Sequence, residues 1–311
     1  MASFPSLPSR GQSVLPSLGT PQLSQTLQNN PLQSVTAAMG DAAASGLTVL
    51  QSAAAAAKAA EAAKLAPGID DWSSKPSPEH PRPVVLVHGT YGTAYNYWLV
   101  MAPLLAASGY SVFRLDYGAM PGILGIHGIA PLEQSAQELA EFVDRVLAAT
   151  GADKVDIVGH SQGGMLPRHY IKFLGGAEKV HHLIGISPSN HGTTMHGLAE
   201  IAKQFPGAEE LVGAVTPACL DQISTSEFLR RLNEDGETTP GVNYTVIATR
   251  YDEVVTPYTS CWLAEGPQVT NVLVQDSAPT DLSGHGLIVY SPTATRAVLT
   301  ALAAKDRVGG A

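Results

Sequence analysis

The stretch Lys154-Val-Asp-Ile-Val-Gly-His-Ser-Gln-Gly-Gly-Met165 decides the fold. It begins as a short apolar strand and continues, after a turn, into a helix expected over residues 164–174. The turn has the pattern G-x-S-x-G, in which a sharply turned serine presents its hydroxyl at the end of a sheet. The pattern alone also occurs by chance. The strand before it and the helix after it therefore carry the prediction that Ser161 is a nucleophile.

Composition limits what kind of protein this is. The chain has 311 residues, which is enough for one large domain with a full core. Its formal net charge of −9 argues against a nucleic-acid partner, because phosphate binding requires clustered Lys and Arg. No run of about 18 apolar residues occurs, so we expect no membrane-spanning helix. We also find no metal cluster with recognisable ligand spacing, and we expect no cofactor.

The first 79 residues differ from the rest and are predicted to be a low-complexity tail. Residues 1–31 are rich in Ser, Pro, Gln and Leu without a sustained period, which is typical of disorder. Residues 37–66 are dominated by alanine, the strongest helix former, and predict a helix. Residues 73–83 contain four prolines and are expected to form an extended linker. The catalytic domain is predicted to span residues 80–311.

Strand and helix patterns alternate after this tail. The continuous apolar run Val84-Val-Leu-Val87 suits a strand that is buried on both faces of a parallel sheet. Further strands are expected over residues 111–115 and 181–186, and helices over residues 96–107 and 131–150. This alternation predicts an α/β protein with a mostly parallel sheet and helices on both faces. The loops that follow the strands then share one edge of the sheet.

Two backbone N–H groups are candidates for an oxyanion hole. The sequence His88-Gly-Thr-Tyr-Gly92 follows the first strand directly. In hydrolases built on such a sheet, this loop supplies one N–H and the residue after the nucleophile supplies the other. We therefore assign Thr90 and Gln162 to this role; the alternative is a plain turn that ends a strand.

A serine nucleophile requires a histidine base and a carboxylate that orients it. On this type of sheet the chain order is Ser, then Asp or Glu, then His. The histidines that this order excludes are His80, His88, His127, His160, His169, His181, His182, His191 and His196. His285 remains, in the Gly-flanked segment Ser283-Gly-His-Gly-Leu287. Asp252 is the predicted acid because it follows an expected strand over residues 243–248, and Asp276 is the alternative.

An apolar loop suggests a site for an oily substrate. Residues 117–126 are apolar but are interrupted by glycine and proline, so they do not form an ordinary core element. We expect Ile123, Leu124 and Ile126, together with Ile288 and Val289 after the base, to contact substrate. The alternative is a buried connection. If the groove is complete, water-insoluble esters of medium to long acyl chains are preferred over short soluble ones.

The two cysteines, Cys219 and Cys261, are expected to form a disulfide. Such a bridge would tie the loop after Asp252 to the segment that precedes a helix-like stretch over residues 226–233. It would also favour an oxidising compartment. The alternative is two free buried thiols.

Four motifs in order resemble the bacterial triacylglycerol lipases of the lipase class 2 group. They are Val85-Leu-Val-His-Gly-Thr90, Val158-Gly-His-Ser-Gln-Gly-Gly164, Ile247-Ala-Thr-Arg-Tyr-Asp-Glu-Val-Val-Thr-Pro257 and Ser283-Gly-His-Gly-Leu287. The resemblance covers about residues 83–302. It implies an α/β-hydrolase with a reduced, small-lipase-like core, ester hydrolysis of acylglycerols without an organic cofactor, and export from the cell.

Alternatives remain open beside this resemblance. An esterase or acyltransferase acting on shorter acyl or polyester substrates would use the same residues. A non-catalytic interaction module would keep the fold without the activity. We expect a lipid or ester substrate, met at a lipid–water interface, and a secreted protein. The chain starts without the basic and apolar segments of a secretory signal, so a cytoplasmic protein is the alternative. The oligomeric state does not follow from the sequence.

Overall fold

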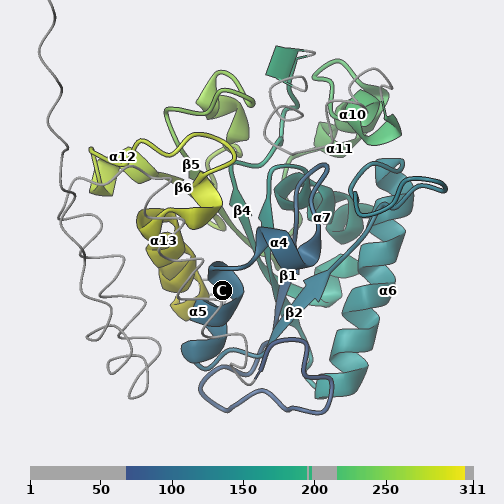
Figure 1. Cartoon of the computed structure of the whole chain (residues 1–311), viewed down its shortest axis with the longest axis vertical. Coiled ribbons are helices and arrows are strands. Elements are labelled where there is room, and N and C mark those ends of the chain that lie inside the picture. Colours follow the sequence, from purple (N-terminus) through teal and green to yellow (C-terminus); the bar gives the residue numbers. More distant parts are fainter. Residues whose placement is uncertain (1–67, 195, 198–215, 305–311) are drawn as a thin grey trace, which may run out of the picture.

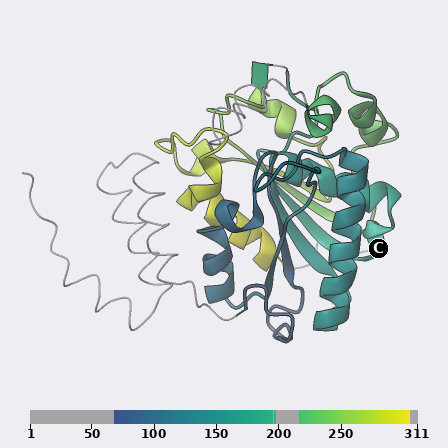
Figure 2. The same cartoon turned by 45° about the vertical axis from the view of Figure 1, so that its right-hand side comes forward.

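The computed structural model describes residues 68–194, 196–197 and 216–304. The predicted tail therefore lies outside the described residues up to residue 67, and so does all of the alanine-rich helix expected over residues 37–66. The described part forms a six-stranded sheet in the order β2-β1-β3-β4-β5-β6. All neighbouring strands pair in parallel, and helices lie on both faces of the sheet (Figures 1 and 2).

The elements follow the predicted alternation along the chain. The strands are β1 (Val84–Val87), β2 (Val112–Leu115), β3 (Val155–His160), β4 (Val180–Ile186), β5 (Asn243–Ala248) and β6 (Val269–Leu273). The helices are α4 (Ala94–Tyr97), α5 (Met101–Ala107), α6 (Leu132–Thr150), α7 (Gln162–Phe173), α10 (Pro217–Asp221), α11 (Glu227–Asn233), α12 (Val274–Ser277) and α13 (Pro292–Ala303). Short 3-10 turns lie at Gly176–Glu178, Tyr258–Cys261 and Ile288–Tyr290.

The continuous apolar run of β1 is explained by its place inside the sheet. Successive side chains of a strand point to opposite faces. Val85 and Val87 face a core cluster that includes residues of α6 and α7. Val84 and Leu86 face a second cluster formed with α5 and α13. Both faces are therefore dry, as expected for a parallel sheet covered on each side.

The helix expected over residues 131–150 is confirmed as α6. Its buried residues recur with helical spacing, for example at Leu132, Leu139 and Val146. Gly151 ends it in a left-handed conformation with φ 74°, and its N–H bonds to the carbonyl of Leu147. A residue with a Cβ would be strained there, so the glycine fixes where the helix stops.

The helix expected over residues 96–107 is divided into α4 and α5. The chain leaves the helical conformation at Trp98, whose side chain is fully buried in the second core cluster. Thr93 caps α4 by accepting a hydrogen bond from the N–H of Asn96. Apolar periodicity predicted the helical content here, but it does not show where the helix is interrupted.

The residues directly before the expected linker pack against the sheet. Ile69 pairs with Val112 at the edge of the sheet, and Asp70 forms an ion pair with Arg114 at 2.7 Å. The ring of Trp72 lies 4.9 Å from that of Phe113. The folded unit therefore includes residues from 68 onward, upstream of the predicted boundary at residue 80.

The predicted disulfide is wrong, because Cys219 and Cys261 are both free and buried. Each thiol has its own surroundings. The Cys219 sulfur lies 3.1 Å from the hydroxyl of Tyr91 and 3.2 Å from that of Thr216. Cys261 lies in the 3-10 turn after the predicted acid, and burial, followed by the charge of Asp252, raises the pKa of its thiol.

Candidate active site

Ser161 occupies a strained turn between β3 and α7. Its φ of 55° is rare for a residue with a side chain, and it lies directly before the first residue of the helix. The turn is possible because its flanks are glycines. A methyl group on Gly159 would overlap the carbonyl of Gly163, and one on Gly163 would overlap the carbonyl of Val87. The motif therefore presents the hydroxyl as its pattern predicts.

The structure brings Ser161, His285 and Asp252 together. The Nε2 atom of His285 lies 2.9 Å from the Oγ atom of Ser161. Its Nδ1 atom lies 3.0 Å from each carboxylate oxygen of Asp252. All three residues are buried. This is the geometry in which a histidine takes the proton of a serine while a carboxylate fixes its tautomer.

The surroundings of Asp252 keep its carboxylate ionised. Burial alone would raise the pKa of this group, but the charge and hydrogen bond of His285 outweigh it, and the pKa is lowered. The N–H groups of Val254 and Val255 also donate to Oδ1, at 3.0 and 2.8 Å. Asp276, the alternative acid, is exposed on the short helix α12. The structure thus brings Asp252, and not Asp276, to His285.

The backbone of His285 is held on both sides. Its N–H donates to the carboxylate of Glu253 at 2.9 Å. Its carbonyl oxygen lies 2.9 Å from Nε2 of His160, whose Nδ1 contacts the hydroxyl of Tyr97. The ring of the base is therefore fixed through Asp252 and its main chain through two other side chains. The sequence analysis gave Glu253 no role and considered His160 only as a base, which it excluded, so both contacts were missed.

The two residues assigned to the oxyanion hole are joined by their side chains. The hydroxyl of Thr90 donates to Oε1 of Gln162 at 2.8 Å, and both side chains are buried. Gln162 is the first residue of α7, so its N–H has no partner within that helix. The helix dipole adds partial positive charge at this end. A negative oxygen next to Ser161 would therefore meet a favourable field.

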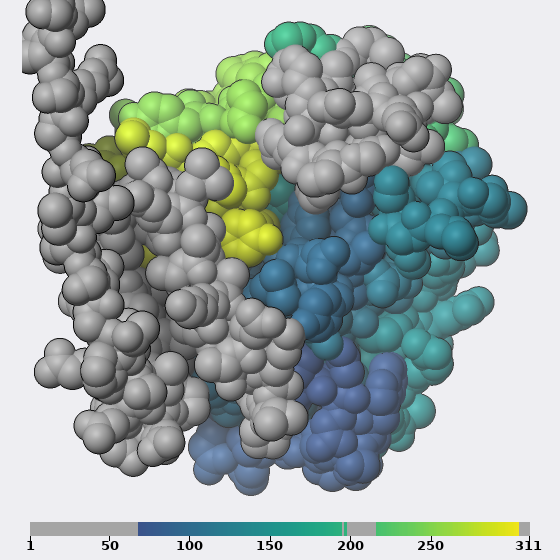
Figure 3. All heavy atoms as spheres, in the orientation of Figure 1, coloured from purple at the N-terminus to yellow at the C-terminus, as the bar shows by residue number. Residues whose placement is uncertain are grey.

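A cleft of about 620 Å³ opens beside the base. It is lined by Tyr91, Gly92, Thr93, Asn96, Tyr97, Gly125, Ile126, Glu253, Gly284, Gly286, Leu287, Val289 and Tyr290. The blue surface that follows β1 and the yellow surface of the C-terminal segment adjoin in Figure 3, and both contribute walls of this cleft. The triad side chains themselves do not line it, but Gly284 and Gly286 flank His285 in sequence, and Glu253 is adjacent to Asp252. The cleft is therefore the candidate place for a substrate.

The five residues expected to bind substrate have different positions. Ile126 and Val289 line the cleft. Ile123 packs against the first core cluster, and Leu124 is 93% exposed to solvent. The structure does not bring Ile288 to the cleft, because this side chain is fully buried in the second core cluster and is absent from the cleft's lining. Val289 belongs to the same cluster but also lines the cleft.

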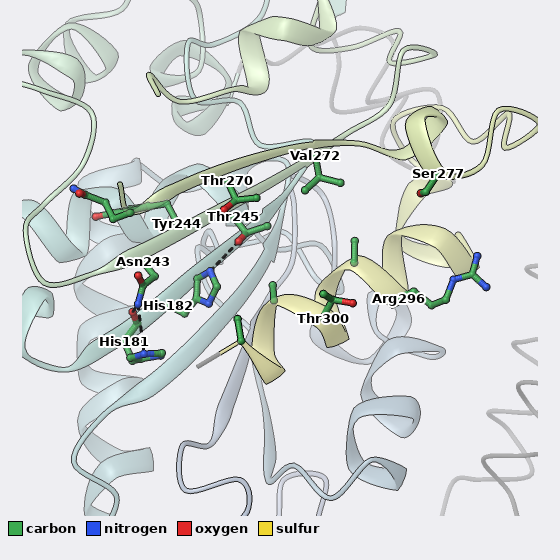
Figure 4. Close-up of a pocket in the computed structure, with 14 residues that line it drawn as sticks. His181, His182, Asn243, Tyr244, Thr245, Thr270, Val272, Ser277, Arg296 and Thr300 are labelled. Carbon is green, nitrogen blue, oxygen red and sulfur yellow. Dashed lines mark hydrogen bonds between the residues drawn. The ribbon is translucent and has the colours of Figure 1, made fainter. Parts of the chain in front are cut away.

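A second cavity of about 420 Å³ lies between the strands β4, β5 and β6 and the helix α13. His182 lies here with Nε2 2.9 Å from the hydroxyl of Thr245 (Figure 4). Unlike the cleft, this cavity is lined neither by a triad residue nor by a residue adjacent to one in sequence. Its place under the sheet makes it unsuited to the chemistry of Ser161.

Two further facts concern the described residues only. Within residues 68–194, 196–197 and 216–304, no group of three or more His, Cys, Asp or Glu side chains is arranged to hold a metal ion. In the same part of the chain, every helix is too short or too polar to cross a bilayer.

Comparison with known proteins adds a family and a fold. The model of the family described as "Lipase (class 2)" matches residues 81–293. A triacylglycerol lipase of Pseudarthrobacter phenanthrenivorans and one of Burkholderia plantarii are each 36% identical over 92 residues. These alignments cover 28% of this chain, and 27% and 24% of those proteins. The chain thus spans about a quarter of the length of the curated relatives it matches.

Solved structures confirm the predicted fold class. Lipase B of Aspergillus fumigatus superimposes with a TM-score of 0.58 at 23% identity, over 79% of this chain and 57% of that one. The mature lipase BlEst2 of Bacillus licheniformis gives a TM-score of 0.54 at 17% identity, over 74% and 94%. The six-stranded parallel sheet, with its serine turn after β3, is accordingly an α/β-hydrolase fold.

Proposed function

Because the chain belongs to the lipase (class 2) family, we propose that it hydrolyses carboxylic esters of acylglycerols through an acyl-enzyme. The observation that carries the proposal is the contact of His285 with both Ser161 and Asp252. A buried serine that touches a histidine, which in turn touches an ionised carboxylate, is arranged for nucleophilic attack on a carbonyl.

In the first half of the reaction, Oγ of Ser161 attacks the ester carbonyl while Nε2 of His285 accepts the serine proton. The imidazolium that forms is stabilised by Asp252, which keeps its negative charge. The carbonyl oxygen becomes an oxyanion, and the N–H groups of Thr90 and Gln162 are its proposed donors. Such donors, fixed before the reaction, are worth about 10²–10³ in kcat each.

The first half ends when the bond between the carbonyl carbon and the alcohol oxygen breaks. His285 gives its proton to the leaving alcohol, and the acyl group stays on Ser161 as an ester. In the second half, water loses a proton to His285 and attacks the acyl carbonyl. The second tetrahedral intermediate then breaks its bond to Oγ of Ser161, His285 returns the proton to Oγ, and the carboxylic acid is released. The same side chains thus act twice, in opposite directions.

The lining of the cleft supports an apolar acyl or alcohol part. Ile126, Leu287 and Val289 contribute apolar surface beside the base. Each buried methylene is worth about 0.8 kcal/mol, so a few carbons change selectivity strongly. We assign the chain a preference for medium to long acyl esters met at a lipid–water interface, and a place of action outside the cell. The description of the family as a lipase supports the first assignment. The second follows only from the export that the resemblance of the four motifs implies.

The proposed activity is tested with a serine-directed phosphonate and a series of p-nitrophenyl esters of increasing acyl length. Wild-type protein is expected to be labelled once, at Ser161, and to hydrolyse the longer esters faster. Ser161→Ala should lose both labelling and turnover. Absence of labelling in the wild type would contradict the proposal, while labelling with best activity on the acetate ester would make the chain an esterase. Comparing lipase activity in the medium and in washed cells of the expressing host tests export.

A further inference from the structure

A buried chain of hydrogen bonds joins the two oxyanion-hole residues to a third side chain, Gln222. Its amide nitrogen lies 2.9 Å from Oγ1 of Thr90 and 2.7 Å from Oε1 of Gln162. On the other side of Gln162, Nε2 donates to the hydroxyl of Tyr117 at 3.1 Å. The side chains of Thr90, Gln162 and Gln222 are at most 1% exposed, so water does not compete for these bonds.

Backbone carbonyls at both ends determine which group donates in each of these hydrogen bonds. The hydroxyl of Tyr117 lies 2.8 Å from the carbonyl oxygen of His88, which accepts only. Tyr117 must therefore donate there and accept from Gln162, which turns Oε1 of Gln162 toward Thr90 and Gln222. At the other end, the carbonyl of Ala218 lies 3.1 Å from the amide nitrogen of Gln222. Only the NH₂ group can face both carbonyl-type oxygens, so Gln222 donates to the pair and does not accept from it. Its two hydrogens meet three acceptors, so one N–H is shared between Oγ1 of Thr90 and Oε1 of Gln162.

The position of Gln222 is itself determined by several contacts. Its Oε1 accepts from the hydroxyl of Ser189 at 3.1 Å. Its backbone follows α10, whose Cys219 touches Tyr91, the neighbour of Thr90. Its carbonyl accepts from the N–H of Thr193 at 2.9 Å. The amide group therefore cannot turn or withdraw without breaking bonds on three sides.

We propose that Gln222 is a positioning residue that keeps the N–H groups of Thr90 and Gln162 aimed at one point. Thr90 and Gln162 follow the neighbouring strands β1 and β3, but the pairing of these strands ends at Val87 and Gly159, before it reaches them. One donor that binds both side chains adds to their direct hydrogen bond and fixes the geometry of the pair. The inference rests on the proposed ester hydrolysis, in which these N–H groups hold the oxyanion.

A loss of this alignment should reduce catalysis more than binding. The ester carbonyl of bound substrate is neutral, whereas the tetrahedral intermediate carries the charge that the N–H groups stabilise. Displacement of a donor by about 1 Å costs about 10²-fold. For Q222M, which keeps the side-chain length but donates nothing, we expect kcat to fall about 10–100-fold and KM to change less than about 3-fold.

Two readouts separate positioning from a merely structural role. A trifluoromethyl ketone adds to Ser161 and places an anionic oxygen in the oxyanion hole, so its affinity should fall with kcat/KM in Q222M. For Q222E, the introduced carboxyl donates only when protonated, and burial raises its pKa. The activity of Q222E relative to wild type should therefore rise as the pH falls from about 8 to about 5.5.

Asp221→Asn is the matched structural control. Asp221 is adjacent to Gln222, but its carboxylate accepts from the N–H of Leu132 at the start of α6, at 2.9 Å. This variant should lower the melting temperature and leave kcat and ketone affinity as in the wild type. Should Q222M not fold, Ser189→Ala decides instead, because it releases only the far end of Gln222 and should lower kcat and ketone affinity together.

Unchanged kcat and ketone affinity in the folded Q222M protein, or in Ser189→Ala if Q222M does not fold, would overturn the inference. So would a constant ratio of Q222E to wild-type activity across the pH range. In both cases the wild type would still hydrolyse esters and react with the phosphonate, so the proposed function would stand. A wild type that neither hydrolyses esters nor reacts with the phosphonate would overturn both the inference and the proposed function.

Discussion

His160 Nε2 lies 2.9 Å from the carbonyl oxygen of His285, so the residue directly before the nucleophile holds the backbone of the base. Since a carbonyl only accepts, Nε2 carries the proton and Nδ1 accepts from the hydroxyl of Tyr97. This arrangement requires a neutral imidazole. Burial, followed by the charge of His285, lowers the pKa of His160 well below its usual range and keeps it neutral.

Replacement of His160 by Leu removes the donor to His285. The carbonyl of the base and the hydroxyl of Tyr97 then lose their partner, at a cost of about 1–3 kcal/mol in the free energy of unfolding. We expect kcat to fall about 10-fold, because the ring of the base is less well placed. Urea unfolding and steady-state kinetics measure the two effects. Unchanged values of both would show that this contact is dispensable.

Replacement of the triad residues should stop turnover without unfolding the protein. Ser161→Ala and His285→Ala are each expected to lower kcat by several orders of magnitude, and Asp252→Asn somewhat less. Asp276→Asn serves as the control, since this carboxylate is exposed on α12, and it should retain wild-type turnover. Loss of turnover in the Asp276 variant alone would show that the acid is assigned wrongly.

Acid should destabilise the fold through its buried histidines. Burial lowers the pKa of His88 to about 4, below its ordinary value of 6.5. The unfolded chain therefore binds a proton before the folded one, and stability is present above pH 6.5 and lost as the pH falls toward 4. Protonation of His88 therefore lowers the free energy of unfolding by about 3 kcal/mol over this pH range.

His191 acts in the opposite direction in the same pH range. Its hydrogen bond to Glu237 raises its pKa, so its contribution is present at low pH and lost as the pH rises through the folded value. His191→Gln should therefore steepen the acid loss, whereas His88→Gln should reduce it. Urea unfolding of the wild type and both variants, at several pH values between about 7 and 4, measures how the free energy of unfolding of each changes with pH. A flat pH profile in the wild type would contradict the prediction.

The apolar loop allows interfacial binding to be separated from catalysis. Leu124 is 93% exposed, so Leu124→Asp should leave stability and hydrolysis of a soluble ester unchanged. If the loop meets the lipid surface, activity on emulsified triacylglycerol should fall several-fold. Ile126→Asp places a charge in the cleft and should impair both substrates. Phe173→Asp, at the far end of α7, is the control for loss of exposed apolar surface.

Both cysteines should be found as thiols. Denatured protein that has not been reduced is expected to release two titratable thiols, from Cys219 and Cys261. In the native state both should react slowly with Ellman's reagent, since both are buried and burial raises the pKa of the Cys261 thiol. Absence of thiols in the denatured protein would contradict the structure.

The fold class and the three residues that meet at the site could be predicted because local patterns carry them. Periodic apolar residues indicate strands and helices, and the chain order on this sheet leaves His285 as the base. The structure brings Ser161 and Asp252 to it. These inferences need only neighbouring residues and topology.

The contacts that support the site could not be predicted in this way. Gln222 has no motif around it, and its role depends on where α10 lies relative to the turn after β1. The predicted disulfide was wrong for the same reason, because the separation of two cysteines in the sequence does not show whether their thiols meet in the fold. Ile288 was misplaced because an apolar residue after the base is suited equally to a cleft and to a core.

The parallel order of the strands also determines at which stage of folding the active site forms. Ser161 and His285 are separated by 124 residues, and the acid comes from a strand between them. Contacts of such long range form late, after most of the loop-closure entropy has been lost. During refolding, helical circular dichroism should therefore recover before reactivity toward the phosphonate. The recovery of enzyme activity would thus report the rate of the last step of folding.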